Sequence, residues 1–285
     1  MYTTLISAPE LQSLLAHGAP VAVFDCSFDL ADPSAADRLF AQAHIAGAQQ
    51  AHLDRDLSAH AGAPRESGGR HPLPTREAFA AWLGAHGVGA ATQVVVYERS
   101  GANYCGRLWW TLKWLGHEAV AVLDGGLTAW QAAGGAVESG AGATPVPCSF
   151  TVGAPAAQLV RTEDVARALG RPAQTLIDAR AAARFRGEVE PLDPVAGHIP
   201  GALNRPFTDN FTADGRFKTA EVLRAEFAAL LGQRAPQTVV HHCGSGVSSV
   251  PNLLAMEVAG LGRTALYAGS WSEWCNTNGL PVAQG

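Results

Sequence analysis

The amino-acid sequence repeats itself at about half its length. A shift of 144 residues places residues 93–135 in register with residues 237–279. In that register Gly116 lies over Gly260, Gly125 over Gly269 and Trp130 over Trp274. Earlier landmarks match at slightly larger offsets, as between the His-Ile-x-Gly-Ala segments at 44–48 and 198–202. A repeat of this length predicts two copies of one folding unit, with insertions of different length between the landmarks.

The size of the chain agrees with two domains. At about 150 residues per domain, 285 residues supply two units that can each bury a core. The stretch 134–155 is rich in glycine and proline and shows no apolar periodicity, which is typical of a linker. We therefore predict a first domain over 1–137, a linker over 138–157 and a second domain over 158–285.

Each half presents short apolar runs and helical stretches in the same order. Apolar runs lie at 21–24, 93–97 and 120–123 in the first half, and at 175–177, 238–242 and 265–267 in the second. Amphipathic stretches at 75–86, 108–115, 219–231 and 253–259 alternate with them. This order predicts an α/β fold in which each domain is a parallel sheet flanked by helices. Sites in such sheets lie beyond the carboxyl ends of the strands, here the loops after Tyr97 and His242.

Charge and cysteine usage exclude several classes of protein. The net charge is −5 and no basic run is present, so nucleic acid is not expected as a partner. No stretch has the length of about 20 apolar residues that a membrane span needs, and the first residues do not resemble a signal peptide, so we expect a cytoplasmic protein without membrane contact. Five cysteines without CxxC spacing favour neither a disulfide framework nor a zinc site.

The loop after the predicted strand 238–242 carries the strongest chemical signal. It reads Cys243-Gly-Ser-Gly-Val-Ser-Ser and leads directly into a predicted helix. Backbone N–H groups of such a turn, at Gly244, Gly246, Val247 and Ser248, form a cradle for an anion. A thiol at its base is expected to be a thiolate near neutral pH and hence a nucleophile. The alternative is a packed cysteine followed by a turn chosen only for its shape.

The other half of the repeat lacks this cysteine. The position that corresponds to Cys243 is Arg99. We therefore expect one copy to carry the chemistry and the other to be silent, with the site formed where the two domains meet.

Several motifs together resemble the two-domain rhodanese-type sulfurtransferases. They are Asp178-x-Arg180, Gly-His-Ile-Pro-Gly-Ala at 197–202, the Cys243 loop and Gly-Ser-Trp-Ser-Glu-Trp at 269–274. The resemblance implies two tandem rhodanese-like domains, an ion pair between Asp178 and Arg180, and a persulfide on Cys243. The Cys-Gly-Ser-Gly-Val loop is most similar to the 3-mercaptopyruvate branch, whereas the thiosulfate branch typically has Cys-Arg-Lys-Gly.

The resemblance also implies residues for the donor carboxylate. Arg184 matches a substrate arginine of the family, and Arg186 lies two positions further on. A guanidinium group binds a carboxylate with two parallel hydrogen bonds. The family usually has a second arginine in a Glu-Pro-Arg segment, where this chain reads Glu190-Pro191-Leu192. Arg186, or Arg99 of the first half, is the candidate replacement.

A proton source completes the set that the resemblance implies. The departing pyruvate enolate needs a proton, and the family positions match Ser245, His71 and Asp54. The predicted enzyme moves sulfur from 3-mercaptopyruvate to a thiol such as thioredoxin, or to cyanide. It needs no metal and no organic cofactor.

Three alternatives compete with this prediction. A cysteine phosphatase would need an arginine six residues after the cysteine, and that residue is Ser249. A non-catalytic sulfur-carrier or binding module agrees with the silent first half but not with Cys243. Thiosulfate as the donor is favoured by the missing second arginine and disfavoured by a loop without a cation.

Overall fold

The computed structural model describes residues 1–99 and 101–285, which form two compact units. The first unit comprises Met1–Pro64, Pro74–Ala156 and Phe211–Phe217. The second comprises Arg65–Leu73, Ala157–Asn210 and Lys218–Gly285. Two short segments, Arg65–Leu73 and Phe211–Phe217, therefore pack with the unit formed mainly by the other half of the sequence. Arg65–Leu73 precedes the predicted linker but packs with the second unit, and this segment contains His71.

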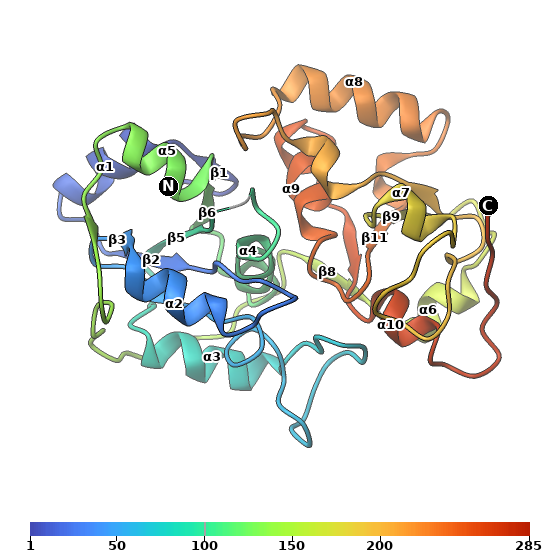
Figure 1. The fold of residues 1–285 in the computed structure, drawn as a ribbon, viewed down its shortest axis with the longest axis horizontal. Coiled ribbons are helices and arrows are strands. Elements are labelled where there is room, and N and C mark those ends of the chain that lie inside the picture. The colour runs from blue at the N-terminus through green and yellow to red at the C-terminus, as the bar shows by residue number, and fades with distance from the viewer. Residues whose placement is uncertain (100) are drawn as a thin grey trace. The chain divides into compact units, whose positions relative to one another are not determined.

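The first unit is built on a five-stranded sheet in the order β1-β6-β5-β2-β4, in which every pair is parallel (Figure 1). A short antiparallel pair, β3 with β7, lies beside it. The elements are β1 (Leu5–Ile6), α1 (Ala8–Ala16), β2 (Val21–Asp25), α2 (Ala35–Gln42), β3 (His44–Ile45), β4 (Gln49–Gln50), α3 (Arg76–Ala85), β5 (Gln93–Tyr97), α4 (Cys105–Trp114), β6 (Val120–Leu123), α5 (Gly126–Ala132) and β7 (Val137–Glu138).

The second unit repeats this architecture with the parallel order β10-β9-β11-β12-β8. Its elements are β8 (Gln158–Val160), α6 (Thr162–Arg167), β9 (Thr175–Asp178), α7 (Ala182–Phe185), β10 (Leu203–Asn204), the 3-10 helix η1 (Phe207–Asn210), α8 (Ala220–Leu231), the 3-10 helix η2 (Pro236–Thr238), β11 (Val239–His242), α9 (Val250–Val258), β12 (Ala265–Tyr267) and α10 (Ser270–Trp274). The predicted α/β class with two parallel sheets flanked by helices is confirmed.

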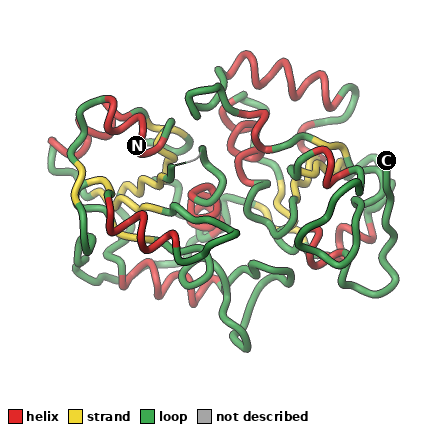
Figure 2. The backbone as a smooth tube through the Cα atoms, viewed as in Figure 1, coloured by secondary structure: helices red, strands yellow, loops and turns green. Residues whose placement is uncertain are grey.

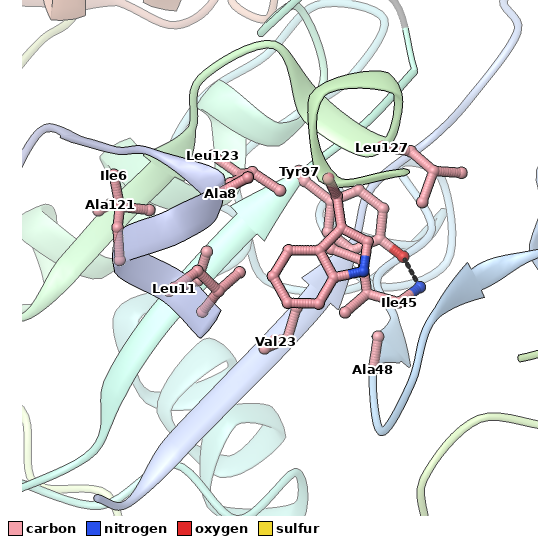
Figure 3. Packing of buried hydrophobic residues seen from close by; sticks show 12 residues of the cluster. Ile6, Ala8, Leu11, Val23, Ile45, Ala48, Tyr97, Ala121, Leu123 and Leu127 are labelled. Carbon is pink, nitrogen blue, oxygen red and sulfur yellow. Dashed lines mark hydrogen bonds between the residues drawn. The ribbon is translucent and has the colours of Figure 1, made fainter. Parts of the chain in front are cut away.

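Helices cover both faces of the first sheet, because its strands alternate apolar side chains between them. Val23 and Tyr97 face a core shared with Leu11 of α1 and Trp130 of α5 (Figure 3). Phe24, the neighbour of Val23, points to the opposite face, where its ring lies 5.6 Å from that of Trp82 in α3. The hydroxyl oxygen of Tyr97 accepts the N–H of Ile45 at 2.9 Å, so this buried polar group is satisfied.

The second sheet is covered in the same way. Val240 faces a core with Val165 of α6 and Trp274 of α10. Its neighbour His241 points to the other face, where its Nε2 lies 3.3 Å from the sulfur of Met256 in α9. Burial lowers the pKa of His241 to about 3, so this ring is neutral and acts as a packed side chain.

Corresponding helices in the two units begin with the same cap. The Thr75 hydroxyl accepts the N–H of Ala78 at 3.2 Å before α3, and the Thr219 hydroxyl accepts the N–H of Val222 at 3.5 Å before α8. These threonines are 144 residues apart, so the repeat extends to the signal that starts a helix. In contrast, residues 51–75 between β4 and α3 contain neither helix nor strand (Figure 2).

Glu98, directly after β5, makes the stability of the first unit depend on pH. Its buried carboxylate accepts the N–H groups of Tyr104 at 2.5 Å and Cys105 at 2.7 Å. Burial nevertheless raises the pKa of Glu98 from 4.5 to about 7. The folded state thus favours the protonated acid, whose contribution to stability is complete below pH 4.5 and is lost as the pH rises through about 7.

We expect Glu98→Gln to remove this dependence, because an amide stays uncharged at every pH. Between pH 4.5 and 7.5 the Glu98 carboxyl should lower the free energy of unfolding of the wild type by up to about 3 kcal/mol. The variant should not show this decrease. Urea unfolding at a series of pH values measures the difference. Glu77→Gln, at an exposed glutamate of α3, is the control and should follow the wild-type curve. Parallel curves for Glu98→Gln and the wild type would contradict the raised pKa.

Candidate active site

Strand β11 delivers Cys243 to the carboxyl end of the second sheet. His242, its last residue, is in register with Asp178 at the end of β9. Cys243 follows directly and is only 2% exposed, and α9 begins at Val250. The predicted order of strand, cysteine loop and helix is therefore present. In the loop Val247 is buried and Ser248 half-buried.

The start of α10 holds the cysteine loop by its carbonyl groups. The Trp271 N–H donates to the Cys243 carbonyl at 2.9 Å, and the Ser272 N–H donates to the Gly244 carbonyl at 2.9 Å. In a trans peptide the C=O and the following N–H point in opposite directions. The N–H groups of Gly244 and Ser245 therefore point away from α10. This orientation allows them to serve an anion in front of the loop.

Ser270 holds the first residue of the same loop by hydrogen bonds. The sequence analysis did not single out this residue. Its hydroxyl accepts the Cys243 N–H at 3.1 Å and donates to the Tyr267 carbonyl at 2.9 Å. Ser270 adopts φ 56°, and it is the only non-glycine residue with positive φ in the part of the chain that the structure describes. Such backbone strain is common at functional sites. Nothing in the sequence around Ser270 marks this conformation, since serine is not a residue that favours it.

Gly246 permits the tight turn of the loop. It adopts φ 75°, and a Cβ atom at this position would overlap the carbonyl of Ala268. Any other residue would therefore destabilise the loop in two ways: by the strain of a left-handed backbone and by overlap with a neighbouring main chain.

We expect Gly246→Ala to lose more than about 3 kcal/mol of stability, or to displace the loop and abolish sulfur loading on Cys243. The matched control is Gly262→Ala, because Gly262 has φ 86° but open space around its Cβ position. That control should lose only about 1–2 kcal/mol. Urea unfolding and cyanide-released sulfur measure the two effects. Equal losses in the two variants would show that the overlap with Ala268 has no effect.

A buried ion pair lies beside Cys243, as the resemblance implied. Arg180 contacts both carboxylate oxygens of Asp178, at 2.7 to 3.1 Å, and both side chains are at most 2% exposed. Burial opposes ionisation of Asp178, but the charges of His242 and Arg180 and the hydrogen bonds lower its pKa. Burial likewise lowers the pKa of Arg180, yet Asp178, Glu190 and Cys243 raise it overall. The pair is therefore fully charged, and Arg180 is a cation next to the cysteine.

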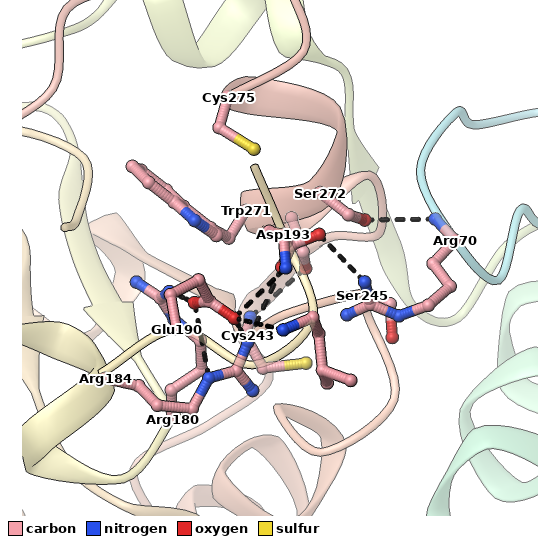
Figure 4. A network of polar contacts seen from close by, with 12 residues as sticks. Arg70, Arg180, Arg184, Glu190, Asp193, Cys243, Ser245, Trp271, Ser272 and Cys275 are labelled. Carbon is pink, nitrogen blue, oxygen red and sulfur yellow. Dashed lines mark hydrogen bonds and ion pairs between the residues drawn. The ribbon is translucent and has the colours of Figure 1, made fainter. Parts of the chain in front are cut away.

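Arg184 belongs to the same network (Figure 4), whereas Arg186 pairs with a different carboxylate. Arg184 binds Glu190 through Nη2 at 2.6 Å and Nε at 3.3 Å, and its side chain is 18% exposed. Arg186 instead pairs with Glu188 at 2.6 Å, with 45% of its side chain exposed. The structure thus gives no support to Arg186 as a replacement for the missing arginine, because its guanidinium is used at the surface.

Arg99, the other candidate replacement, is also committed elsewhere. In the first unit its guanidinium donates to Asp25 at 3.0 Å, to Ser27 at 2.6 Å and to the Leu39 carbonyl at 2.9 Å. A fourth bond goes to the carbonyl of Ala43. The Arg99 guanidinium therefore stabilises its own unit through these hydrogen bonds.

Two charged residues near Cys243 were missed by sequence analysis. Arg70 donates to Asp193 at 2.8 Å, and Asp193 also lies 3.5 Å from Arg184 (Figure 4). A Cβ atom on Gly244 would be 3.2 Å from Nη2 of Arg70 and 3.6 Å from Nη1 of Arg184. Arg70 lies far from Cys243 in the sequence, so only the pair Gly68-Gly69 before it hinted at a close approach.

Ser245 and His71 are brought together. The Ser245 hydroxyl and His71 Nδ1 lie 2.7 Å apart, within hydrogen-bond distance, and both residues are buried. Both belong to the second unit, because the segment Arg65–Leu73 packs there. Asp54 lies in the first unit, where its N–H donates to His52 Nδ1 at 3.2 Å. A contribution of Asp54 to this pair stays a prediction.

In residues 1–99 and 101–285, which the structure describes, no group of three or more His, Cys, Asp or Glu side chains is arranged to hold a metal ion. No helix in this part of the chain combines the length and the apolar character needed to cross a membrane.

Comparison with known proteins assigns the family. The family model described as "Rhodanese-like domain" matches twice, at residues 7–133 and 161–277. The chain therefore belongs to the rhodanese-like family, with two copies of the domain. The two matched segments cover most of both halves of the internal repeat.

Full-length relatives are sulfurtransferases, and this chain is an enzyme of that class. A Pseudomonas aeruginosa protein named probable 3-mercaptopyruvate sulfurtransferase is 45% identical over 99% of this chain and 98% of its own length. The human 3-mercaptopyruvate sulfurtransferase is 37% identical over 90% of this chain and 86% of its own length. The crystal structure of SseA from Escherichia coli, described as a 3-mercaptopyruvate sulfotransferase, is also similar. The match covers 95% of this chain and all of SseA, with a TM-score of 0.79 and 31% identity.

Proposed function

We propose that this sulfurtransferase takes sulfur from 3-mercaptopyruvate and passes it to a thiol through a persulfide on Cys243. The observation that carries the proposal is the 2.7 Å contact between Ser245 and His71 beside Cys243. A proton relay has a use with mercaptopyruvate, whose leaving group is a carbanion, and has none with thiosulfate. The names of the relatives from Pseudomonas aeruginosa and human support the same donor.

The first half-reaction forms one bond and breaks one bond. The Cys243 thiolate attacks the sulfur of the donor, and a new S–S bond forms. The bond between sulfur and the methylene carbon breaks, and its electron pair leaves with carbon as the enolate of pyruvate. Protonation of this enolate gives pyruvate, and the sulfur stays on Cys243 as a persulfide.

Five groups of this chain have roles in that step. The N–H groups of the loop, from Gly244 to Ser248, stabilise the thiolate and the persulfide. Arg184 binds the donor carboxylate. Ser245 delivers the proton, and His71 replaces it, with Asp54 as the residue that orients His71.

The second half-reaction transfers the outer sulfur to an acceptor. An acceptor thiolate attacks this sulfur, the S–S bond breaks, and Cys243 returns as a thiolate. We propose a protein thiol such as thioredoxin as the acceptor, which fits a reducing compartment such as the cytoplasm. Cyanide replaces it in the test tube and leaves as thiocyanate.

Thiosulfate is the second candidate donor, and one observation favours it. The family's second arginine is replaced by Leu192, which is 43% exposed. A Mycobacterium tuberculosis relative, 38% identical over 99% of this chain, has a name that assigns thiosulfate to that protein. With thiosulfate an S–S bond would break and sulfite would leave with the electron pair, without a proton.

Intact mass spectrometry after a single exposure to each donor tests the proposal. We expect 3-mercaptopyruvate to add the mass of one sulfur atom to the wild type, and cyanide to remove it. Cys243→Ala should gain no sulfur, because the nucleophile is gone. The matched control is Cys148→Ala, since Cys148 is an exposed free cysteine, and it should load like the wild type.

Other outcomes would overturn the proposal in different ways. Sulfur gained only from thiosulfate would change the donor. Sulfur gained by Cys243→Ala would remove the nucleophile from the mechanism. No sulfur gained from either donor would favour the non-catalytic module.

A second prediction concerns the proton. Ser245→Ala and His71→Asn should each slow loading by 3-mercaptopyruvate by about 100-fold, because general acid catalysis contributes on that scale. Removal of the sulfur by cyanide from preloaded protein should keep its wild-type rate, since that step needs no proton from the pair. Rapid quench with mass detection measures both rates. Equal slowing of both half-reactions would indicate a damaged loop and not a lost proton source.

A further inference from the structure

Two guanidinium groups from distant parts of the sequence face Gly244. Arg70 binds Asp193 through Nη1, and its Nη2 is the atom nearest to the Cβ position of Gly244, at 3.2 Å. Arg184 binds Glu190 through Nε and Nη2, and its Nη1 lies 3.6 Å from the same position. Each arginine thus uses one edge for a carboxylate of the protein and directs another nitrogen to the residue next to Cys243.

Asp193 connects these two arginines. Its Oδ1 lies 2.8 Å from Nη1 of Arg70, and its Oδ2 lies 3.5 Å from Nη2 of Arg184. The Asp193 side chain is only 3% exposed, and its N–H donates to Glu190 at 3.2 Å. A buried carboxylate held in this way fixes the distance between two like charges that would otherwise repel each other.

The backbone before Arg70 is built for close contact with α10. The Arg70 N–H donates to the Ser272 hydroxyl at 3.0 Å. A Cβ atom on Gly69, which has φ 82°, would lie 2.6 Å from the Gly269 carbonyl, and one on Gly68 would lie 2.6 Å from the Glu273 carboxylate. At Gly69 only glycine allows this approach, because the overlap is with main chain and the backbone is left-handed, so the position of Arg70 is specified by the residue that precedes it.

Arg70 also has unused hydrogen-bonding capacity. Among the described residues its Nε is buried without a hydrogen-bond partner, while the side chain as a whole is 26% exposed. A guanidinium group that is partly open, fixed on one side and unsatisfied on another is suited to bind an anion.

We propose that Arg70 is the second cation for the donor carboxylate and that Asp193 is the positioning residue that holds it beside Arg184. This inference rests on the proposed function, because it assigns the part of the site that recognises 3-mercaptopyruvate. Arg70 binds the donor carboxylate in place of the family's second arginine, whose position is Leu192 in this chain, although Arg70 comes from another segment. The recognised group is a carboxylate next to a carbonyl, bound by two converging guanidinium groups.

Steady-state kinetics with 3-mercaptopyruvate and cyanide test the role of Arg70. Arg70→Met keeps the aliphatic stem and removes the charge, and it should raise KM for the donor by about 10- to 100-fold with little change in kcat. The inhibition constant of pyruvate, which shares the carboxylate but carries no transferable sulfur, should rise by the same factor. Arg70→Lys should recover part of the affinity. Arg65→Ala, an exposed arginine of the same segment, is the control and should behave like the wild type.

A double-mutant cycle tests the role of Asp193. Asp193→Asn should raise KM, and Arg70→Met should have a smaller effect in the Asp193→Asn background than in the wild type, because the two residues act as a unit. Additive effects on KM would show that Asp193 does not position Arg70.

The outcomes separate this inference from the proposed function. Wild type that takes no sulfur from 3-mercaptopyruvate overturns both. Wild type that loads normally, together with Arg70→Met that keeps the wild-type KM and pyruvate inhibition, overturns only the role of Arg70. A lower kcat and a lower melting temperature in Arg70→Met and in Arg70→Lys, at constant KM, would make Arg70 a structural tie and would also overturn it.

Discussion

The buried ion pair of Asp178 and Arg180 is the interaction on which the site depends. Arg180 also donates to the Gly197 carbonyl at 2.7 Å, contacts Glu190 at 3.3 Å and lies 4.8 Å from the ring of Trp271. One guanidinium therefore joins the end of β9, the loop that follows α7 and the start of α10. Removing Arg180 would leave the buried Asp178 carboxylate without its ion-pair partner, which costs about 3–5 kcal/mol. The segments that surround Cys243 would lose their common anchor.

The two halves of the repeat solve the same electrostatic problem in different ways. Each has an aspartate at the end of a central strand, Asp25 in β2 beside β5 and Asp178 in β9 beside β11, and each must be paired because it is buried. In the second unit the cation is Arg180, two residues further on. In the first unit it is Arg99, which occupies the position of Cys243. The silent copy thus uses for its own stability the position at which the other copy carries a nucleophile.

The sequence predicted what local pattern and repetition encode. The two parallel sheets, the helical stretches that begin near Thr75 and Thr219 and the place of Cys243 follow from apolar periodicity and from residues close together in the chain. The edge strands β1 and β8 have two and three residues, too few for a periodic signal. Arg70 and Asp193 were missed because their pairing joins positions 123 residues apart. Arg184 and Arg186 lie two positions apart in the sequence, and only the fold separates the surface pair of Arg186 from the network at Cys243.

The segment Arg65–Leu73 makes the site of the second unit depend on the first half of the chain. It is encoded in the half of the gene that has no nucleophile, yet it folds as part of the unit that has one. It supplies His71 to Ser245 and Arg70 to Asp193. Deletion of the half without the nucleophile would therefore also remove these two side chains from beside Cys243, so residues 158–285 alone would lack part of their own site.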